Sequence, residues 1–289
     1  MTEQIPDQVT ELPCGSIIQH GPCNDRIYLM KIGDNSPDSL PSDLIDMANV
    51  HDYSKIFVKV PLDSSEQFVR EGYVEEASIP GFYNGEETGA FLGYYLSESR
   101  ASKEDAETLD SILYLAFDKS ENAITPLDGD RFALRPCGEG DVEEMASLYR
   151  AVFATYPFPI HDPSYLLSTM QSHVDYFGIE RNGELIALSS AEMDRLAFNA
   201  EMTDFATISQ WRGHSLGVCL LRNMEKEIKR KGIKTAYTIA RARSVGMNIT
   251  FAKLGYTYGG RLINNTNISG DVESMNIWYK MIAVPSPIH

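Results

Sequence analysis

A six-residue loop, Arg212-Gly213-His214-Ser215-Leu216-Gly217, carries the clearest chemical signal in the sequence. It follows a strand-like run and leads into an amphipathic helix. The first N–H groups of a helix have no partner within it, and the helix dipole is positive at that end, so both attract an anion. The glycines allow a ligand to approach the backbone closely, because they have no Cβ. The loop therefore predicts a phosphate or pyrophosphate site that needs no dedicated lysine.

The residues around the loop alternate between strand-like and helical patterns. Apolar spacing predicts helices over 140–156, from Pro163 onward, over 216–228 and over 245–254. Asn182-Gly183 is a strong signal for a hairpin turn. The expected strands cover residues 131–137, 174–179, 184–193, 197–208, 234–240, 256–263 and 273–282. The predicted order is therefore β-α-α-β-β-β-α-β-α-β-β, with the loop after the fourth strand.

The N-terminal part of the chain has a related pattern. Strands are expected over 26–31, 55–61, 73–79 and 89–96, and helices over 42–49, 64–71 and within 97–124. Ser42 is the expected cap of the first helix. Residues 68–73 and 251–256 share the spacing Phe-x₃-Gly-Tyr, in which a helix ends at glycine and a strand begins. This indicates an internal repeat whose N-terminal copy lacks the phosphate loop.

The formal charge of −16 is confined to the first part of the 289-residue chain. Residues 1–128 contain 24 Asp and Glu against 8 Lys and Arg, whereas residues 129–289 contain 17 of each. This change, with the Pro-, Asp- and Gly-containing segment 125–130, predicts a domain boundary at 128/129. The acidic half argues against nucleic acid as a partner and is compatible with solubility or with a cationic substrate.

Cysteine usage and hydropathy indicate a soluble, cytoplasmic protein. The four cysteines have neither metal-site nor disulfide spacing and are expected to be reduced thiols. The first residues are acidic and polar, unlike a signal peptide, and the longest apolar run, 112–117, is too short to cross a membrane. We therefore expect no metal and no membrane as partners.

The element order, with Arg212–Gly217 before the long helix, resembles the GNAT acetyltransferase family over about residues 130–283. The coenzyme A loop of that family reads Arg/Gln-x-x-Gly-x-Gly/Ala. Arg212 and Gly217 match it, and Ser215 stands where the middle glycine is usual. The resemblance implies an α/β (α+β) fold with a mixed central sheet flanked by helices. It makes residues 129–289 an N-acetyltransferase domain and residues 1–128 a smaller, non-catalytic α/β domain resembling a degenerate GNAT half.

Further segments resemble the β-lysine N6-acetyltransferase subfamily, so that the similarity spans nearly the whole chain. These segments are 55–61, 72–73, 79–83, 203–206, 237–242, 246–251, 264–268 and 273–276. Enzymes of that type acetylate the terminal amine of β-lysine, which lysine 2,3-aminomutase makes, and the product Nε-acetyl-β-lysine is a compatible solute. The resemblance therefore implies acetyl-CoA as co-substrate, a small cationic amine as acceptor and a functional link to lysine 2,3-aminomutase.

Two other functions stay open at this point. The acceptor could be another small amine, such as a polyamine, an amino acid or a peptide N-terminus. Alternatively, the chain could be a non-catalytic acyl-CoA-binding regulatory module.

Acetyl transfer to a lysine-type amine needs a carboxylate that removes a proton from the nitrogen. GNAT enzymes often carry it on the strand before the loop, eleven residues before the loop's first Arg or Gln, and that position here is Glu201. Strand alternation would place Asp204 on the opposite face of the sheet. Glu192 and Asp194, on the preceding strand, are expected to act as reserve bases or to bind the amine.

The resemblance also assigns binding residues. The backbone of Phe205 to Thr207 is expected to pair with the pantetheine amides as a pseudo-strand. Arg241 is expected to bind the substrate carboxylate, and Asn265 to belong to a recognition loop between the last two strands. The expected cofactor-binding residues are Phe205, Ala206, Thr207, Arg212, Gly213, His214, Ser215, Leu216, Gly217 and Asn248.

Three further expectations concern the acceptor side. Residues 156–161 should form one wall of the acceptor site. Phe251 occupies the usual place of the tyrosine that protonates the leaving thiolate, so Tyr237, Tyr256, Tyr258 or water must do this instead. The N-terminal domain is expected to shape the acceptor site or a dimer interface, which leaves a homodimer open.

Overall fold

The protein is described by a computed structural model over residues 7–103, 105–124 and 126–282. Residues 1–6 and Thr125, which belong to the expected polar N-terminus and linker, lie outside the described residues. The predicted order of elements in the C-terminal part is confirmed. Its strands are β7 (Ala133–Pro136), β8 (Val174–Arg181), β9 (Glu184–Asp194), β10 (Asn199–Thr207), β11 (Thr235–Arg241), β12 (Thr257–Ile268) and β13 (Asp271–Met281). Its helices are α5 (Val142–Val152), α6 (Pro163–Met170), α7 (Leu216–Arg230) and α8 (Val245–Lys253), with the 3₁₀ turns η1 (Glu139–Asp141) and η2 (Ser209–Trp211).

Two details of the C-terminal part follow from backbone conformation. Asn182 and Gly183 have φ of 54° and 83°, as a tight hairpin turn requires, and they join β8 to β9 as predicted. The last two strands are longer than predicted. The expected polar loop around Asn265 is part of β12, inside a bulge where the register with β13 shifts between Leu262 and Thr266.

The N-terminal part contains the predicted elements, two more strands, and two helices within 97–124 where one was expected. Its strands are β1 (Gln8–Glu11), β2 (Ile17–Gly21), β3 (Arg26–Lys31), β4 (Lys55–Pro61), β5 (Val74–Tyr83) and β6 (Glu87–Tyr95). Its helices are α1 (Leu40–Val50), α2 (Leu62–Arg70), α3 (Glu98–Ala101) and α4 (Ala106–Ser120). Strands β1 and β2 were not predicted. Helix α1 begins earlier than expected, with Ser39 as its N-cap, so Ser42 lies within its first turn and donates to the Ser39 carbonyl oxygen at 2.8 Å.

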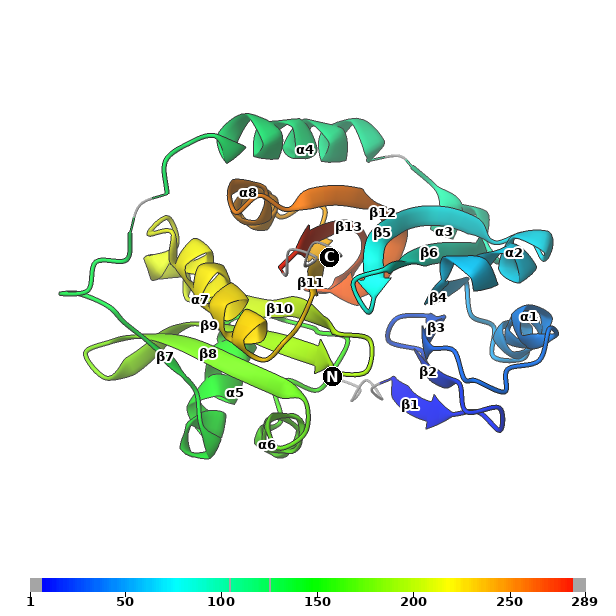
Figure 1. Ribbon diagram of the computed structural model, residues 1–289, viewed down its shortest axis with the longest axis horizontal. Coiled ribbons are helices and arrows are strands. Elements are labelled where there is room, and N and C mark those ends of the chain that lie inside the picture. The colour runs from blue at the N-terminus through cyan, green and yellow to red at the C-terminus, as the bar shows by residue number, and fades with distance from the viewer. Residues whose placement is uncertain (1–6, 104, 125, 283–289) are drawn as a thin grey trace, which may run out of the picture.

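One mixed sheet joins all thirteen strands of the described ranges. Its order is β1-β2-β3-β4-β6-β5-β12-β13-β11-β10-β9-β8-β7. Figure 1 shows β1–β4 with α1 and α2 on one side of the molecule and β7–β10 with α5–α7 on the other. Strands β11–β13 lie between these groups. The sheet has the mixed character expected of a helix-flanked α/β protein.

The two halves of the sheet repeat the same connectivity. The order β3-β4-β6-β5 mirrors β10-β11-β13-β12, with α1 matching α7 and α2 matching α8. The first pair of strands is parallel in both halves, and the others are antiparallel. Both helix ends use the same local structure, in which the N–H of Tyr73 or Tyr256 donates to the carbonyl of Phe68 or Phe251 at 3.1 Å. The halves meet where β5 pairs with β12 at Ala77 and Gly260.

A shared hydrophobic cluster holds the halves together. It combines buried side chains of the N-terminal strands, such as Phe57 and Phe82, with Tyr237, Leu262 and Ile277 of the C-terminal strands. The rings of Phe82 and Tyr237 meet edge-on, with their centroids 4.9 Å apart. Each Å² of apolar surface that this cluster removes from water stabilises the fold by roughly 25 cal/mol. Separating the halves would expose that surface, so the cluster favours one fixed arrangement.

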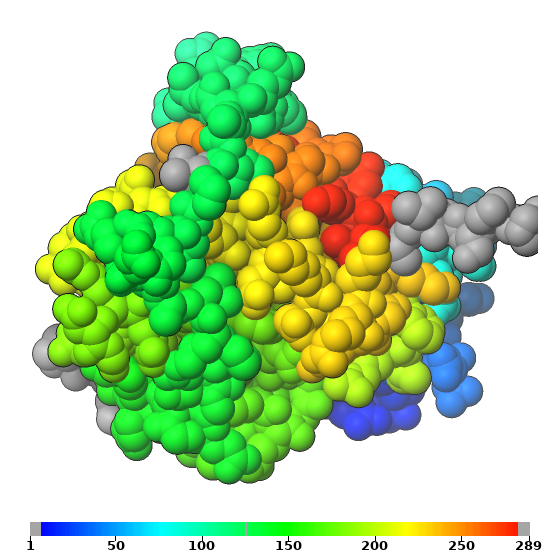
Figure 2. Space-filling view, turned by 60° about the vertical axis from the view of Figure 1, so that its left-hand side comes forward, coloured from blue at the N-terminus to red at the C-terminus, as the bar shows by residue number. Residues whose placement is uncertain are grey.

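Helix α4 connects the halves on the outside of the molecule. It packs on α8, the ring of Phe117 meets that of Trp278 edge-on at 5.6 Å, and Arg261 binds Asp110 at 2.8 Å. Figure 2 shows α4 as a lobe that stands out from the body. The described residues between α4 and β7 form no helix or strand, and a domain boundary at 128/129 within that segment stays a prediction. Within the described ranges, no helix is both long and apolar enough to cross a membrane.

Candidate active site

Strands β10 and β11 separate in the middle of the sheet. They pair in parallel only over Asn199–Glu201 and Thr235–Tyr237, and no later pair is formed between the described residues of these strands. A cavity of about 680 Å³ opens from this point. Beyond it, β10 keeps pairing with β9 through Ala206 and Thr207, so the edge of β10 that faces β11 is available to a ligand. A split between parallel strands is a common place for a ligand, because backbone groups there lack a partner strand.

The predicted phosphate loop lies at one end of this cavity, at the start of α7. Ser215 is the N-cap of the helix and has a left-handed backbone, φ 58° and ψ 23°, a conformation that glycine adopts more easily. Gly213 has φ 85°. A Cβ added at Gly217 would meet no described atom closer than the Thr250 Oγ1 at 3.7 Å. This open backbone at a helix N-terminus fits a pyrophosphate group.

Most of the expected cofactor-binding residues line the cavity. Those that do are Phe205, Thr207, Arg212, Gly213, Ser215, Leu216 and Gly217. Ala206 is buried behind the strand, with 1% of its surface exposed, and does not contribute to the lining. His214 is also outside the lining, because its ring packs against Phe132 and Trp211 with centroids 5.9 Å away in each case.

Asn248 has a structural position, which corrects the expected contact with coenzyme A. Its side chain is fully buried. Its amide donates to the carbonyl of Ser244 at 2.8 Å and to that of Arg241 at 3.1 Å, and its Oδ1 accepts from Asn276 and Trp278 at 2.8 and 2.9 Å. With its donors and its acceptor used in this way, the side chain ties the start of α8 to β11 and β13.

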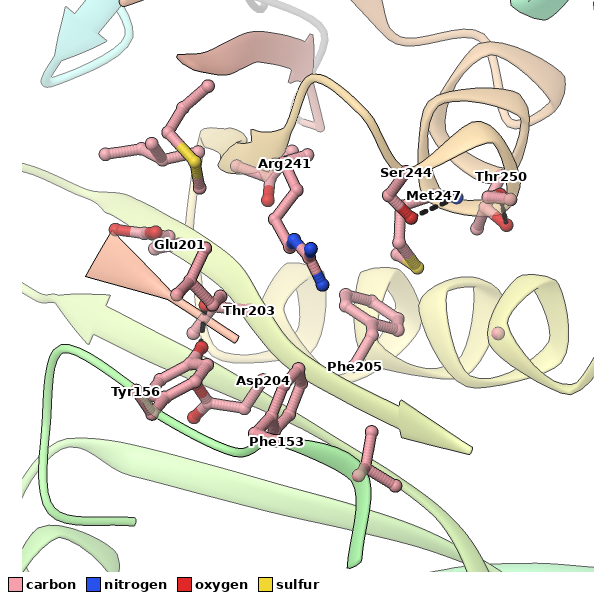
Figure 3. A pocket seen from close by; sticks show the side chains of 18 of the residues that line it. Phe153, Tyr156, Glu201, Thr203, Asp204, Phe205, Arg241, Ser244, Met247 and Thr250 are labelled. Atoms are coloured by element: carbon pink, nitrogen blue, oxygen red, sulfur yellow. Dashed lines mark hydrogen bonds between the residues drawn. The ribbon is translucent and has the colours of Figure 1, made fainter. Parts of the chain in front are cut away.

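A bulge in β10 brings two acidic side chains to the same cavity. The register with β9 shifts between Thr203 and Ala206, and Asp204 has φ 55°. The prediction that Asp204 faces the opposite side from Glu201 is therefore wrong, because a bulge interrupts the alternation of side chains. Both residues line the cavity. In Figure 3, Glu201, Thr203 and Asp204 lie along the same stretch of strand, with Tyr156 next to them.

Glu201 has the environment of a general base. Burial and, less strongly, the neighbouring Glu192 raise the pKa of its carboxyl group, Lys59 acts against them, and the resulting pKa is about 7. A hydrogen bond from Tyr237 also acts in the lowering direction. A carboxylate with a pKa near neutrality accepts a proton effectively at physiological pH.

Asp204 is held by neighbouring hydroxyl groups. Tyr156 and Ser190 each donate to one of its carboxylate oxygens at 2.5 Å. Burial raises the pKa of Asp204, and these hydrogen bonds act against that shift. Both of its oxygens are engaged, so Asp204 is better suited to fixing Tyr156 in the wall than to accepting the substrate's proton.

The two reserve acids of β9 lie in different surroundings. Glu192 lines the cavity, pairs in register with Glu201 and lies 3.6 Å from the Nε2 of His173. Asp194 is exposed, does not line the cavity, and accepts from the N–H groups of Leu196 and Ala197 at 2.9 Å each. The expected role of Asp194 in substrate binding is therefore corrected to a role in the β9–β10 turn.

Arg241 points from the end of β11 toward the strand that carries Glu201 and Phe205 (Figure 3). Its guanidinium is already engaged, since it donates through Nε and Nη2 to both carboxylate oxygens of Glu273, the second at 2.5 Å. Its Nη1 donates to the Ser269 hydroxyl at 3.1 Å. Asn265 also lines the cavity, and only 1% of its surface is exposed.

None of the three tyrosines considered as proton donors lines the cavity. Tyr237, Tyr256 and Tyr258 are absent from the wall, whereas Phe251 is part of it. The tyrosines that do line it are Tyr28, Tyr156, Tyr165 and Tyr176, and Tyr156 lies at the start of the expected wall segment 156–161. Pro157, Phe158 and Ile160 of that segment also line the cavity, and His161 does not.

The N-terminal half contributes three side chains that sequence reasoning missed. Arg26 and Tyr28 of β3 and Phe57 of β4 line the same cavity as Glu201. No local pattern could have identified them, because their strands read as ordinary buried strands. Only the pairing of β5 with β12 brings them to this place.

Comparisons with known proteins identify the family of the chain. Residues 143–256 match the model of the acetyltransferase (GNAT) family. The chain is 41% identical over 266 residues to the β-lysine N(6)-acetyltransferase of Methanococcus maripaludis, covering 92% of this chain and 96% of that one. It is 34% identical to the β-lysine N(6)-acetyltransferase of Methanosarcina mazei, covering 82% of this chain and 94% of the other. It is also 34% identical to the N-acetyltransferase YodP of Bacillus subtilis, covering 92% and 96%.

Proposed function

The chain belongs to the GNAT family of acetyltransferases, and we propose that it transfers the acetyl group of acetyl-CoA to the N6 amine of β-lysine. Two relatives that carry the name β-lysine N(6)-acetyltransferase, at 41% and 34% identity over most of the chain, support this acceptor. The observation that carries the chemistry is the position of Glu201. Its carboxyl group, with a pKa of about 7, lies where β10 and β11 separate, in the cavity that also contains the phosphate loop.

The proposed reaction is a direct attack in a ternary complex. The N6 amine is charged at neutral pH, and Glu201 accepts its proton, directly or through a water molecule. The neutral nitrogen then forms a bond to the thioester carbonyl carbon, and the carbon–sulfur bond breaks. As the amide forms, the nitrogen gives its second proton to water, and the sulfur leaves as a thiolate and takes a proton from water. Phe251 cannot donate this proton, and the three expected tyrosines are outside the wall.

The residues present fit acetyl-CoA as the acetyl donor. The open backbone from Gly213 to Gly217 would hold the pyrophosphate at the N-terminus of α7. The free edge of β10 at Phe205 and Thr207 would pair with the pantetheine amides. The thioester would then lie beside the point where the two strands separate, close to Glu201.

The proposal also includes the source of the substrate, the use of the product and the role of the N-terminal half. The substrate would come from an enzyme of the lysine 2,3-aminomutase type, and the acetylated product would serve as a compatible solute in the cytoplasm. The N-terminal half would shape the acceptor site without supplying the base. A homodimer remains a separate prediction, which sedimentation analysis of the full chain would test.

The test is an assay of thiol release from acetyl-CoA with β-lysine, α-lysine, spermidine and a peptide N-terminus in parallel. We expect the highest kcat/KM with β-lysine, and the product's NMR spectrum should place the acetyl group on N6. A clear preference for another amine would contradict β-lysine as the acceptor and leave the proposed acetyl transfer intact. Tight binding of acetyl-CoA without turnover of any amine would instead support a binding module.

A further inference from the structure

Arg26 is a buried cation in the acceptor part of the cavity. Only 4% of its surface is exposed, and it lines the cavity together with Glu201. No carboxylate of the described residues lies within ion-pair distance of its guanidinium. Its Nη1 donates to the carbonyl of Asn265 and, at 3.1 Å, to the Thr266 hydroxyl, and its Nε is buried with no hydrogen-bond partner among the described residues. An arginine with an unused donor in such a place is suited to bind an anionic group.

The other cations near the cavity have partners or lie elsewhere. The guanidinium of Arg241 binds Glu273 through two hydrogen bonds. Lys59 does not line the cavity, and its amine donates to the Tyr237 hydroxyl at 3.4 Å. Arg212 and Lys253 belong to the end formed by the phosphate loop and α8. Arg26 is therefore the cation best placed for an anion on the acceptor.

An unused acceptor lies beside this unused donor. The Oδ1 of Asn265 is buried without a hydrogen-bond partner among the described residues, and the same residue's carbonyl oxygen accepts from Arg26. A buried polar atom without a partner is energetically unfavourable, so a ligand that pairs with it gains affinity. A donor that attracts anions next to an acceptor that attracts N–H groups is complementary to a zwitterion.

Side chains of the N-terminal half fix the position of the β12 bulge that contains Asn265. Lys55 donates to the carbonyl of Ile263 at 2.6 Å, and Arg100 donates to that of Asn264 at 2.6 Å. Glu76 accepts from the N–H of Ile263 at 2.7 Å and pairs with Lys55 at 2.9 Å. Since these contacts come from buried groups on successive residues of the bulge, the position of Asn265 relative to Arg26 is well defined.

We infer that Arg26 binds the carboxylate of the amino-acid acceptor and that the Asn265 side chain accepts a hydrogen bond from its second, non-reacting ammonium group. This inference rests on the proposed function, because it assumes that the acceptor enters the cavity with its terminal amine at Glu201. It replaces Arg241 as the carboxylate site and gives the N-terminal half a role in choosing the substrate. The acceptor class would be amino acids with a free carboxylate and an amino group near it, in preference to plain diamines.

Two analogues of β-lysine separate the two contacts. 1,4-Diaminopentane lacks only the carboxylate, and 6-aminohexanoate lacks only the amino group at C3. In the wild type, we expect kcat/KM to be highest for β-lysine and lower for both analogues. Arg26→Gln should reduce the preference for β-lysine over 1,4-diaminopentane at least about tenfold, mainly through KM for β-lysine. Asn265→Ala should instead reduce the preference for β-lysine over 6-aminohexanoate.

Controls address folding and charge. Arg243→Gln removes an exposed arginine that pairs with Asp105 outside the cavity and should leave both preferences as in the wild type. Arg26→Lys keeps a positive charge without the planar fork, so its preference should lie between those of the wild type and Arg26→Gln. The melting temperature of each variant shows whether a change in KM reflects the fold.

Failure of the inference and failure of the proposed function give different results. If the wild type acetylates β-lysine and Arg26→Gln keeps the full preference over 1,4-diaminopentane, the inference is wrong and the function stands. If no amine is turned over, calorimetric titration of β-lysine and 1,4-diaminopentane into the coenzyme A complex still tests the contact. If Arg26→Gln binds β-lysine more weakly than the wild type does, while 1,4-diaminopentane binds both proteins equally, the inference is supported. If β-lysine binds both proteins equally, the inference is overturned.

Discussion

Glu201 and Tyr237 are directly paired residues of two parallel strands, at the last position where β10 and β11 are joined. Glu201 therefore lies on a fixed section of sheet, while Thr203 to Phe205 border an open cavity. A base held in this way has a defined orientation without being sealed from the substrate. The phenol of Tyr237 also donates a hydrogen bond toward Glu201, which favours its charged form.

Replacing Glu201 by Gln should lower kcat by about 10²- to 10⁴-fold, because the amide cannot accept the proton of the substrate amine. KM for acetyl-CoA should change little, since Glu201 lies apart from the phosphate loop. Steady-state kinetics with both substrates varied would measure this. The matched control is Glu184→Gln, an exposed carboxylate on β9. Unaltered kcat in Glu201→Gln would remove Glu201 from the role of base.

The acid limb of the pH profile should follow the pKa of Glu201, about 7. Below that pH the carboxyl group is protonated and inactive, so kcat/KM should rise as pH increases through about 7. Glu192→Gln removes a charge that raises this pKa, so the limb should move to lower pH. Lys59→Met removes a charge that lowers it, so the limb should move to higher pH. Shifts in the same direction for both variants would contradict this assignment.

Asn248→Ala should mainly destabilise the protein. The substitution removes a fully buried amide that donates to backbone carbonyls and accepts from Asn276 and Trp278, which leaves those groups without partners. We expect a loss of about 3 kcal/mol in the free energy of unfolding, measured by urea denaturation. Asn122→Ala, at an exposed position, is the control. If Asn248→Ala has normal stability and a raised KM for acetyl-CoA, the expected contact between Asn248 and coenzyme A would be supported.

Substitutions of Ser215 test whether the backbone conformation of the phosphate loop matters for binding acetyl-CoA. Its φ of 58° is tolerated by serine, is easy for glycine and is strained for a β-branched residue. Ser215→Gly should therefore retain KM for acetyl-CoA, whereas Ser215→Val should raise it several-fold and lower the melting temperature. Ser209→Val, an exposed position outside the loop, should do neither. Equal effects of Gly and Val at position 215 would mean that the serine hydroxyl, rather than the backbone, is what matters.

Local patterns predicted much of the fold. The strand over 26–31 and the strand over 55–61 match β3 and β4, and the hairpin at Asn182-Gly183 formed as expected. These features depend on residues that are close in the chain, such as alternating apolar side chains and turn residues that accept positive φ. The two extra strands, β1 and β2, were missed because their sequences show no clear alternation.

The phosphate loop at Arg212–Gly217 could be inferred from residue types at short spacing, whereas Glu201 became a candidate base only through the resemblance to GNAT acetyltransferases. Their surroundings depend on the tertiary structure. A bulge in β10, which the alternation of side chains does not reveal, directs Asp204 toward the cavity. Buried hydrogen bonds hold the side chain of Asn248 away from it. Arg26 and Asn265 are 239 residues apart in the chain and adjacent in space, because β5 and β12 join the two halves into one sheet. Contacts of that separation depend on how strands pair, and no local pattern encodes the pairing.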